Sequence, residues 1–270
     1  MTLFLGLCVA AVLLFAATWL VGRRLGNYGI VDVVWSLAFA PAAVGLALAR
    51  GGAGPRQWLM AAAVSLWSLR LGAYLARRVL SHLDVEDARY ARMRIDWAPQ
   101  ADTKMLVFYA QQAAALVLLC LPTVAVMADA RTDLAGLQVV GAVVFLLALA
   151  GEAASDAQLA SFKKSARSGA ICDRGLWAWT RHPNYFSDWL VWVGFALCAA
   201  SSPWGGLFGL GCVGAMYHLL HNVTGVPLME EHLRRSRGAA FDAHCRRVPS
   251  AFWPRWPRAE KLRGGGAPVE

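Results

Sequence analysis

The sequence predicts an all-α fold, an integral membrane bundle of about seven transmembrane helices. Two observations lead to this prediction. Hydrophobic residues make up 58% of the 270 residues and charged residues only 16%, whereas a soluble domain carries about 25% charged residues. The apolar residues also gather in runs close to the roughly 20 residues that a helix needs to cross the hydrocarbon core. Both features favour a membrane protein over a soluble domain.

Seven apolar runs are the expected spans. Basic residues close the first three runs, at Arg23, Arg50 and Arg77, and a Ser-Ser-Pro turn separates the last two. The chain starts without the basic stretch and cleavage site of a signal peptide, so the first run is expected to be retained. The expected spans cover roughly residues 2–22, 29–49, 57–76, 106–128, 133–155, 184–201 and 203–222.

The basic residues predict the orientation of these spans. With the N-terminus outside, 22 Lys and Arg residues fall in the inside connections and the tail, and only Arg50, Arg56 and Arg131 fall outside. This asymmetry follows the positive-inside rule and places the C-terminus in the cytoplasm. Topology together with an anionic ligand or lipid surface accounts for the net charge of +9, so no nucleic-acid partner is expected.

The domain organisation is expected to be simple. Residues 1–255 are expected to form a single polytopic membrane domain without internal repeats. Residues 256–270, which are rich in Gly and Pro and lack apolar periodicity, are expected to form a disordered cytoplasmic tail.

Three further patterns are judged to carry no chemistry. The six cysteines form no CxxC pair, which argues against a disulfide framework or a zinc site. The stretch GLGCVG (residues 209–214) matches a dinucleotide fingerprint, but it lies within an apolar helix, where small residues favour close helix packing. The pair His218 and His221 in HLLHN has no other histidine clustered near it, so no metal site is expected.

Polar residues inside the apolar runs are costly in a bilayer and usually face a cavity or a partner. Asp32 lies at the start of the second run, and Arg70 and Tyr74 lie one turn apart in the third. For any one of them an interhelical hydrogen bond is a sufficient explanation. As a set, most lie near the cytoplasmic helix ends, which predicts a pocket open to the cytoplasm. The further members of the set are Gln111, Gln112, Glu152, Ser155, Asp156, Gln158 and Lys163.

The stretch GLWAWTRHPNYFSDWLVWVGFAL (residues 175–197) places polar residues where an apolar helix begins. Pro183 suits the first turn of that helix, whose free N–H groups can bind anionic or carbonyl oxygen. Asn184 offers a donor and an acceptor that match a primary carboxamide. Cationic residues of the last two cytoplasmic segments suit phosphate. A positive-inside cluster at the lipid headgroups would explain the cations, but not Asn184 and Asp188.

The same stretch resembles the C-terminal domain of the steroid 5-alpha-reductase family, and related sterol reductases share its RHPNY element. The closest resemblance is to a bacterial branch of integral membrane proteins, with DVVWS (32–36), WSLRLGAYLARR (67–78), EDARY (86–90) and PLMEEHL (227–233) as further features. The resemblance covers about residues 30–255. It implies a seven-helix protein of the bacterial inner membrane that uses NADPH to reduce an activated carbon–carbon double bond in a lipid.

The resemblance also implies site residues, with the cofactor in the half formed by about residues 133–255. Asn184 resembles the asparagine that binds the nicotinamide carboxamide, and Asp156 and Lys163 resemble cofactor contacts after the fifth helix. Tyr74 resembles the catalytic proton donor. Asp32 stands where the family carries a catalytic glutamate, and Phe241 and His244 stand where it carries tyrosines. Further candidates are Arg174, Arg181, Tyr185, Asp188 and Arg246 for the cofactor and Arg70, Trp35 and Gln111 for the substrate.

Two other functions remain open at this point. Isoprenylcysteine carboxyl methyltransferases also carry an RHPxY element followed by an acidic and basic tail, and they bind S-adenosylmethionine. The stretch from Glu230 to Phe252 would suit such an enzyme almost equally well, whereas Asn184 after the proline argues against it. A non-catalytic lipid-binding membrane protein is the third possibility, and it would bind neither nucleotide.

Overall fold

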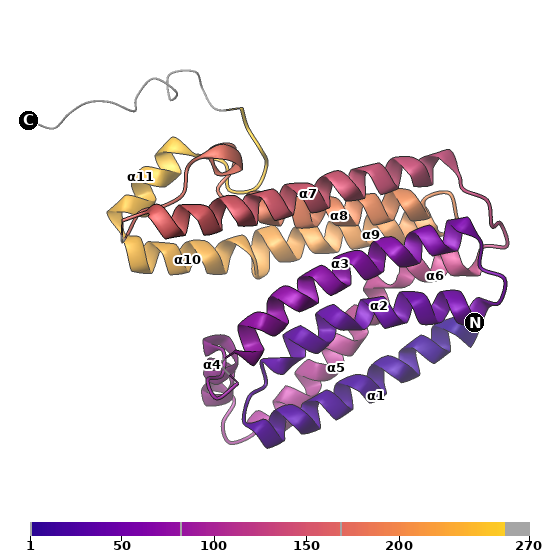
Figure 1. The fold of residues 1–270 in the computed structure, drawn as a ribbon. Coiled ribbons are helices and arrows are strands. Elements are labelled where there is room, and N and C mark those ends of the chain that lie inside the picture. Colours follow the sequence, from indigo (N-terminus) through magenta and orange to yellow (C-terminus); the bar gives the residue numbers. More distant parts are fainter. Residues whose placement is uncertain (1, 82, 168, 257–270) are drawn as a thin grey trace, which may run out of the picture. The chain divides into compact units, whose positions relative to one another are not determined.

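A computed structural model describes residues 2–81, 83–167 and 169–256. These residues form helices and contain no β-strand (Figure 1). The predicted disordered tail lies, apart from Trp256, outside the described residues. The helices are α1 (Thr2–Leu25), α2 (Ile30–Arg50), α3 (Pro55–Leu80), α4 (Ala88–Asp96), α5 (Ala101–Leu119), α6 (Leu121–Ala128), α7 (Gly136–Ser165), the 3-10 helix η1 (Gly175–Ala178), α8 (Pro183–Ala199), α9 (Gly205–His218), the π-helix η2 (Leu219–Val223), α10 (Val226–Arg237) and α11 (Ala239–Arg247).

The lengths and compositions of the described helices support an all-α membrane protein with four to five candidate spans. The helices α1, α2, α3 and α7 are each long and apolar enough to cross a bilayer. The expected fourth span is instead two helices, α5 and α6, which meet at Cys120 with a bend of 41°. Pro122 in the first turn of α6 lacks a backbone N–H and so suits a new helix start there. The expected sixth and seventh spans correspond to α8 and α9, with 17 and 14 residues.

The chain divides into two compact units. Unit 1 comprises Met1–Ala142 and Phe195–Cys212, and unit 2 comprises Val143–Gly194 and Val213–Glu270.

The core of unit 1 rests on the close packing of α2 against α3, which lie side by side in Figure 1. The Ser68 hydroxyl of α3 donates to the Ser36 carbonyl of α2 at 2.6 Å and accepts from the Ala40 N–H at 3.1 Å. It is thus inserted into one turn of the α2 hydrogen-bond ladder, next to Pro41, which has no N–H to offer. At Gly72 an added Cβ would lie 2.2 Å from a Leu37 methyl carbon, so glycine permits this approach.

The first glycine of GLGCVG, Gly209, also serves packing, whereas Gly211 and Gly214 have open space around them. The motif lies in α9, and a Cβ on Gly209 would lie 2.7 Å from the Ala196 Cα of α8. The backbones of these two helices can approach closely because position 209 has no side chain.

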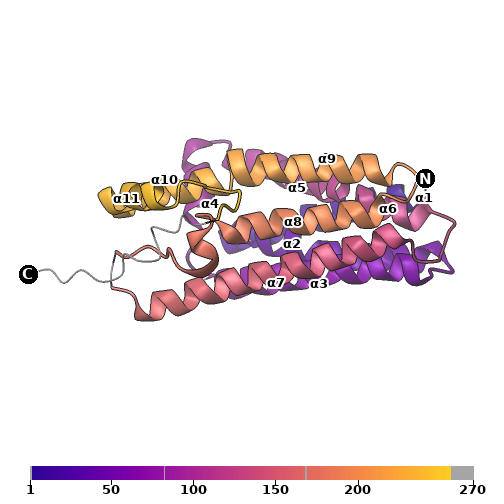
Figure 2. The ribbon, with the colours of Figure 1, turned by 90° about the horizontal axis from the view of Figure 1, so that it is seen from above.

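Unit 2 is organised around α7 and the first part of α8, which lie side by side in Figures 1 and 2. A Cβ on Gly151 of α7 would lie 3.0 Å from the Ser187 hydroxyl of α8. The 3-10 helix η1 also docks on α7. The Trp177 indole donates to the Ser155 carbonyl and the Leu176 N–H to the Gln158 side chain, both at 2.9 Å. The contacts of η1, which precedes the RHPNY stretch, are thus with the part of α7 where polar residues begin.

Candidate functional site

The RHPNY stretch of unit 2 is held by an acidic residue from a distant part of the chain, Glu230 of α10. The Arg181 Nε donates to Glu230 Oε1 at 2.7 Å, and the His182 Nε2 lies 3.3 Å from the same oxygen. Burial alone would raise the pKa of the Glu230 carboxyl, but the hydrogen bonds from His182 and Arg181 more than offset it and lower the pKa to about 2. Glu230 is therefore a carboxylate at every physiological pH.

Arg181 also binds the segment that follows α11. Its Nη1 donates to the carbonyls of Val248 and Pro249, both at 2.8 Å, and its backbone N–H donates to the Ser250 carbonyl at 2.9 Å. Three of its donor groups are thus committed to the protein. The predicted role of Arg181 in cofactor binding stays a prediction, whereas its role in tying α8 to α10 and the C-terminal segment is visible in the structure.

The first turns of α8 carry the polar groups that point to a ligand. The Asn184 side-chain oxygen is buried and has no hydrogen-bond partner among the described residues. The Tyr185 ring stacks on the His182 ring with centroids 5.3 Å apart. Asp188 follows Asn184 by one turn and is half-buried. A buried carbonyl oxygen without a donor is costly, so a ligand group or water that donates a hydrogen bond is expected there.

The other predicted cofactor residues come from separate elements of unit 2. Asp156, half-buried, and Lys163, exposed, lie on α7. Arg174 precedes η1 and Arg246 lies on α11, and both are exposed. These three cations can reach an anionic ligand only as flexible side chains, because no ion pair or side-chain hydrogen bond with another described residue fixes their position.

His244 of α11 is a buried group of the same unit to which the sequence analysis gave no role. Only 2% of it is exposed, and its Nδ1 has no hydrogen-bond partner among the described residues. Burial lowers the pKa of His244 to about 4, and the nearby Arg247, Arg181 and His182 act in the same direction against Asp173. The imidazole is therefore neutral at pH 7.

Asp32, a predicted catalytic residue of unit 1, is held by residues of α4. Asp32 accepts a hydrogen bond from the Tyr90 hydroxyl at 2.6 Å and pairs with the Arg89 guanidinium at 2.7 Å. Arg89 also binds Asp87, which in turn binds Arg78 of α3. Both Asp32 oxygens are thus engaged by residues of α4. This arrangement ties α4 to α2 and is the interhelical contact that the sequence offers as an alternative explanation for Asp32.

The remaining predicted residues of unit 1 differ in exposure. Tyr74 is 60% exposed on α3, with Arg70 one turn before it and half-buried. Gln111 is exposed on α5. The Trp35 indole nitrogen is buried without a hydrogen-bond partner among the described residues, which fits a substrate oxygen that accepts a hydrogen bond.

A second polar cluster of unit 1 encloses the α1–α2 connection. The Tyr28 hydroxyl donates to Asp102 at 2.7 Å, and Arg23 pairs with Asp102 at 2.8 Å. The Tyr28 N–H donates to Glu86, which also pairs with Arg94 at 3.0 Å. Burial and the hydrogen bond to Asp102 raise the pKa of Tyr28 to about 12. This cluster fixes the connections on one end of the unit.

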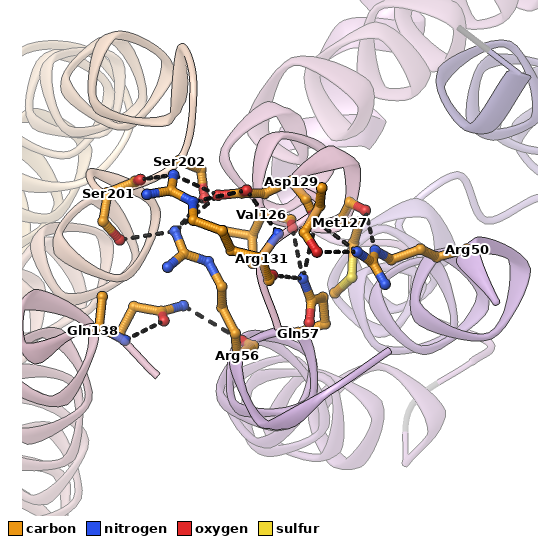
Figure 3. Close-up of polar contacts among 12 residues, drawn as sticks. Arg50, Arg56, Gln57, Val126, Met127, Asp129, Arg131, Gln138, Ser201 and Ser202 are labelled. Atoms are coloured by element: carbon orange, nitrogen blue, oxygen red, sulfur yellow. Dashed lines mark hydrogen bonds and ion pairs between the residues drawn. The ribbon is translucent and has the colours of Figure 1, made fainter. Parts of the chain in front are cut away.

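A third polar network of unit 1, which we call the Arg56 network, lies at the α2–α3 connection (Figure 3). Arg56 pairs with Asp129 at 3.1 Å and donates to the hydroxyls of Ser201 and Ser202, each at 2.9 Å. Its members are Arg50, Arg56, Gln57, Asp129, Arg131, Gln138, Ser201 and Ser202.

The Arg56 network gathers all three arginines that the orientation count places outside. Arg50 donates to the carbonyls of Met127 and Asp129, so it satisfies the end of α6. The hydrogen bond from Arg131 holds the pKa of the Asp129 carboxyl below its ordinary value. Sequence reasoning missed the network because its hydrogen-bonded partners are up to 146 residues apart. The one available signal was the rarity of cations on that side.

The family described as "Protein of unknown function (DUF1295)" matches residues 18–248. No curated protein and no solved structure matches the chain. The matched range runs from the end of α1 to the end of α11 and includes both the RHPNY stretch and the Asp32–Tyr90 pair. Because this range is well over half of the 270 residues, the chain belongs to the DUF1295 family.

Proposed function

We propose that the protein is an NADPH-dependent membrane reductase that adds hydride to an activated carbon–carbon double bond of a lipid. The observation that carries the proposal is the buried Asn184 oxygen, which has no partner among the described residues. A primary carboxamide has two N–H donors and an acceptor, so the nicotinamide amide matches the asparagine side chain in both directions. The sequence resemblance at RHPNY favours the same cofactor.

The surroundings of Asn184 also fit a dinucleotide. The Glu230 carboxylate fixes the RHPNY turn through Arg181 and His182, so Asn184 is presented on a rigid helix start. The exposed side chains of Lys163, Arg174 and Arg246 would bind the phosphates, as cations commonly do. Asp156 and Asp188 would accept hydrogen bonds from hydroxyl groups of the cofactor.

In the proposed reduction, NADPH, Tyr74 and a solvent proton each have one role. When bound, NADPH supplies the hydride. Tyr74 would donate a hydrogen bond to the carbonyl oxygen of a conjugated enone, which draws electron density from the β carbon that accepts the hydride. A solvent proton then completes the reduction at the α carbon. The exposed position of Tyr74 on a span fits an apolar substrate that arrives from the bilayer.

We further propose seven spans with the N-terminus outside and the C-terminus in the cytoplasm of a bacterial cell. The 17 residues of α8 reach about 26 Å at the usual rise of an α-helix. The helix α9 continues without a break into η2, and η2 ends at Val223. The excess of Lys and Arg in the inside connections supports the orientation.

A binding assay with detergent-purified protein tests the cofactor assignment. NADPH and S-adenosylmethionine are titrated in parallel against the tryptophan fluorescence of the wild type and of Asn184→Ala. NADPH should bind the wild type. The substitution should lower the affinity for NADPH about tenfold, as expected for the loss of one hydrogen bond in a buried site. The matched control is Asn222→Ala, which removes an exposed asparagine of the same unit and should change nothing.

Two results would overturn the proposal. If S-adenosylmethionine binds and NADPH does not, the protein belongs with the methyltransferases that share the RHPxY element. If neither binds, it is a lipid-binding membrane protein without this chemistry. The substrate class is then tested by NADPH oxidation against a panel of apolar enones.

A further inference from the structure

The segment after α11, residues 248–256, runs back along the start of α8, and we call it the strap. The Arg181 N–H donates to the Ser250 carbonyl and the Arg255 N–H donates to the Trp179 carbonyl, both at 2.9 Å. The Arg181 guanidinium holds the strap carbonyls of Val248 and Pro249. These bonds fix the path of the strap on both sides of its centre.

The strap presents one face to the protein and another away from it. Phe252 is buried among rings of α8 and α9, including Trp189 and Tyr217 at centroid distances of 6.1 and 5.4 Å. Trp253 is 45% exposed, with part of its ring packed on Trp189 at a centroid distance of 5.1 Å, and Trp256 is 80% exposed.

A third tryptophan, Trp179, extends the exposed face of the strap. Its ring lies 5.0 Å from that of Trp256. Among the described residues, the indole N–H groups of Trp179, Trp253 and Trp256 have no hydrogen-bond partner. These three exposed residues form what we call the tryptophan patch.

The position of the patch along the span α7 indicates what covers it. The residues just before Trp179 are fixed to α7 at Ser155 and Gln158 through the Trp177 indole and the Leu176 N–H. This is where α7 passes from its apolar part into a polar end with Lys163 and Lys164. With α7 as a membrane span, this position corresponds to the boundary between hydrocarbon and water.

The composition of the patch suits the lipid headgroup region. Tryptophan concentrates at this depth, since its ring prefers the acyl boundary while its N–H can bond to headgroups or water. The strap carries Arg255 and no acidic residue, so its charge is complementary to anionic headgroups. We propose that the strap lies on the bilayer surface, with Trp179, Trp253 and Trp256 as its anchors in the headgroup region.

Fluorescence quenching in vesicles tests this proposal independently of any enzymatic activity. The full chain is reconstituted in vesicles of phosphatidylethanolamine and phosphatidylglycerol, with bromine on either the upper or the terminal acyl carbons of part of the lipid. Because the chain has 12 tryptophans, the signal of interest is the difference between the wild type and the variant Trp253→Phe/Trp256→Phe. This difference should be quenched strongly by upper-chain bromine, less by terminal bromine and weakly by iodide in the buffer.

Two outcomes would overturn the proposal. Strong quenching by iodide without quenching by bromine would place the strap in water. Resistance to both quenchers would show that protein, either the rest of this chain or a second copy, covers the patch. Trp192→Phe is the matched control, because Trp192 is buried in the same unit outside the strap and its difference signal should resist both quenchers. Trp256→Phe alone, at the most exposed position, repeats the measurement if the double variant loses its fold.

Discussion

Arg56 and Asp129 form an ion pair of 3.1 Å in which the two side chains are only 1% and 5% exposed. The pair joins the first turn of α3 to the residue that ends α6, and the Arg56 Nη2 also donates to the hydroxyls of Ser201 and Ser202. Removing two charges from water is expensive, so this pair contributes to the fold mainly through the geometry it enforces.

Removing one partner of this ion pair should lower the stability of the protein more than removing both partners. Asp129→Leu leaves the Arg56 charge buried without its acid, at an expected cost of about 3–5 kcal/mol. The double variant Arg56→Leu/Asp129→Leu should recover part of that loss, because no uncompensated charge remains. Thermal unfolding in detergent measures both, and an equally severe loss in the double variant would show that the serine hydrogen bonds matter more than the charges.

The Ser68 hydroxyl offers a prediction with a matched control on the same helix. Ser68→Ala leaves the Ser36 carbonyl and the Ala40 N–H of α2 without their partner in the core, at an expected cost of about 1–3 kcal/mol. Ser65→Ala removes a buried hydroxyl that has no partner among the described residues, so it should be neutral or stabilising. Comparable unfolding temperatures for the two variants would contradict the inference that the Ser68 hydroxyl stabilises one turn of α2.

Much of the helical architecture could be predicted because apolar runs and basic ends are local signals. The first three expected spans differ from α1, α2 and α3 by only a few residues at most ends. The break at Cys120 was missed although Pro122 was visible, because the apolar run continues through it. Apolar length alone does not distinguish one straight helix from two bent ones.

The candidate sites could be predicted only in part, because partners distant in sequence leave no local signal. Pro183 correctly indicated the start of α8. The PLMEEHL stretch was recognised in the sequence, but the hydrogen bond that its Glu230 accepts from Arg181, 49 residues away, was not predicted. Tyr90 was noted within EDARY, and its bond to Asp32 spans 58 residues. The roles of Asn184 in cofactor binding and of Tyr74 in catalysis stay predictions.

His244 predicts a stability change in mildly acidic solution. Its pKa of about 4 in the folded protein lies below its ordinary value of 6.5, so the unfolded chain binds a proton between these values and the folded chain does not. The contribution to stability is complete above pH 6.5 and is lost as the pH falls toward 4. The unfolding temperature of the wild type should therefore drop over this window more than that of His244→Phe.

Glu230 predicts a second and lower window. Its pKa is lowered from 4.5 to about 2, so its stabilising contribution is complete above pH 4.5 and is lost as the pH falls toward 2. Glu230→Gln should lower the unfolding temperature at pH 7 and flatten the pH dependence below 4.5. Glu231→Gln, which changes the exposed neighbour, is the control and should leave both nearly unchanged.

The contacts of Asp32 allow its catalytic and structural roles to be separated. If Asp32 serves mainly to hold α4, then Asp32→Asn, Tyr90→Phe and Arg89→Leu should each lower the unfolding temperature, since each removes one side of the same contact. If Asp32 is instead the second catalytic group, Asp32→Asn should abolish NADPH-dependent turnover while Tyr90→Phe leaves most of it. The structure favours the first outcome, because both carboxylate oxygens already have partners and an acid that is to act on substrate needs one of them available. The comparison of unfolding temperatures decides the structural role even before a substrate is known.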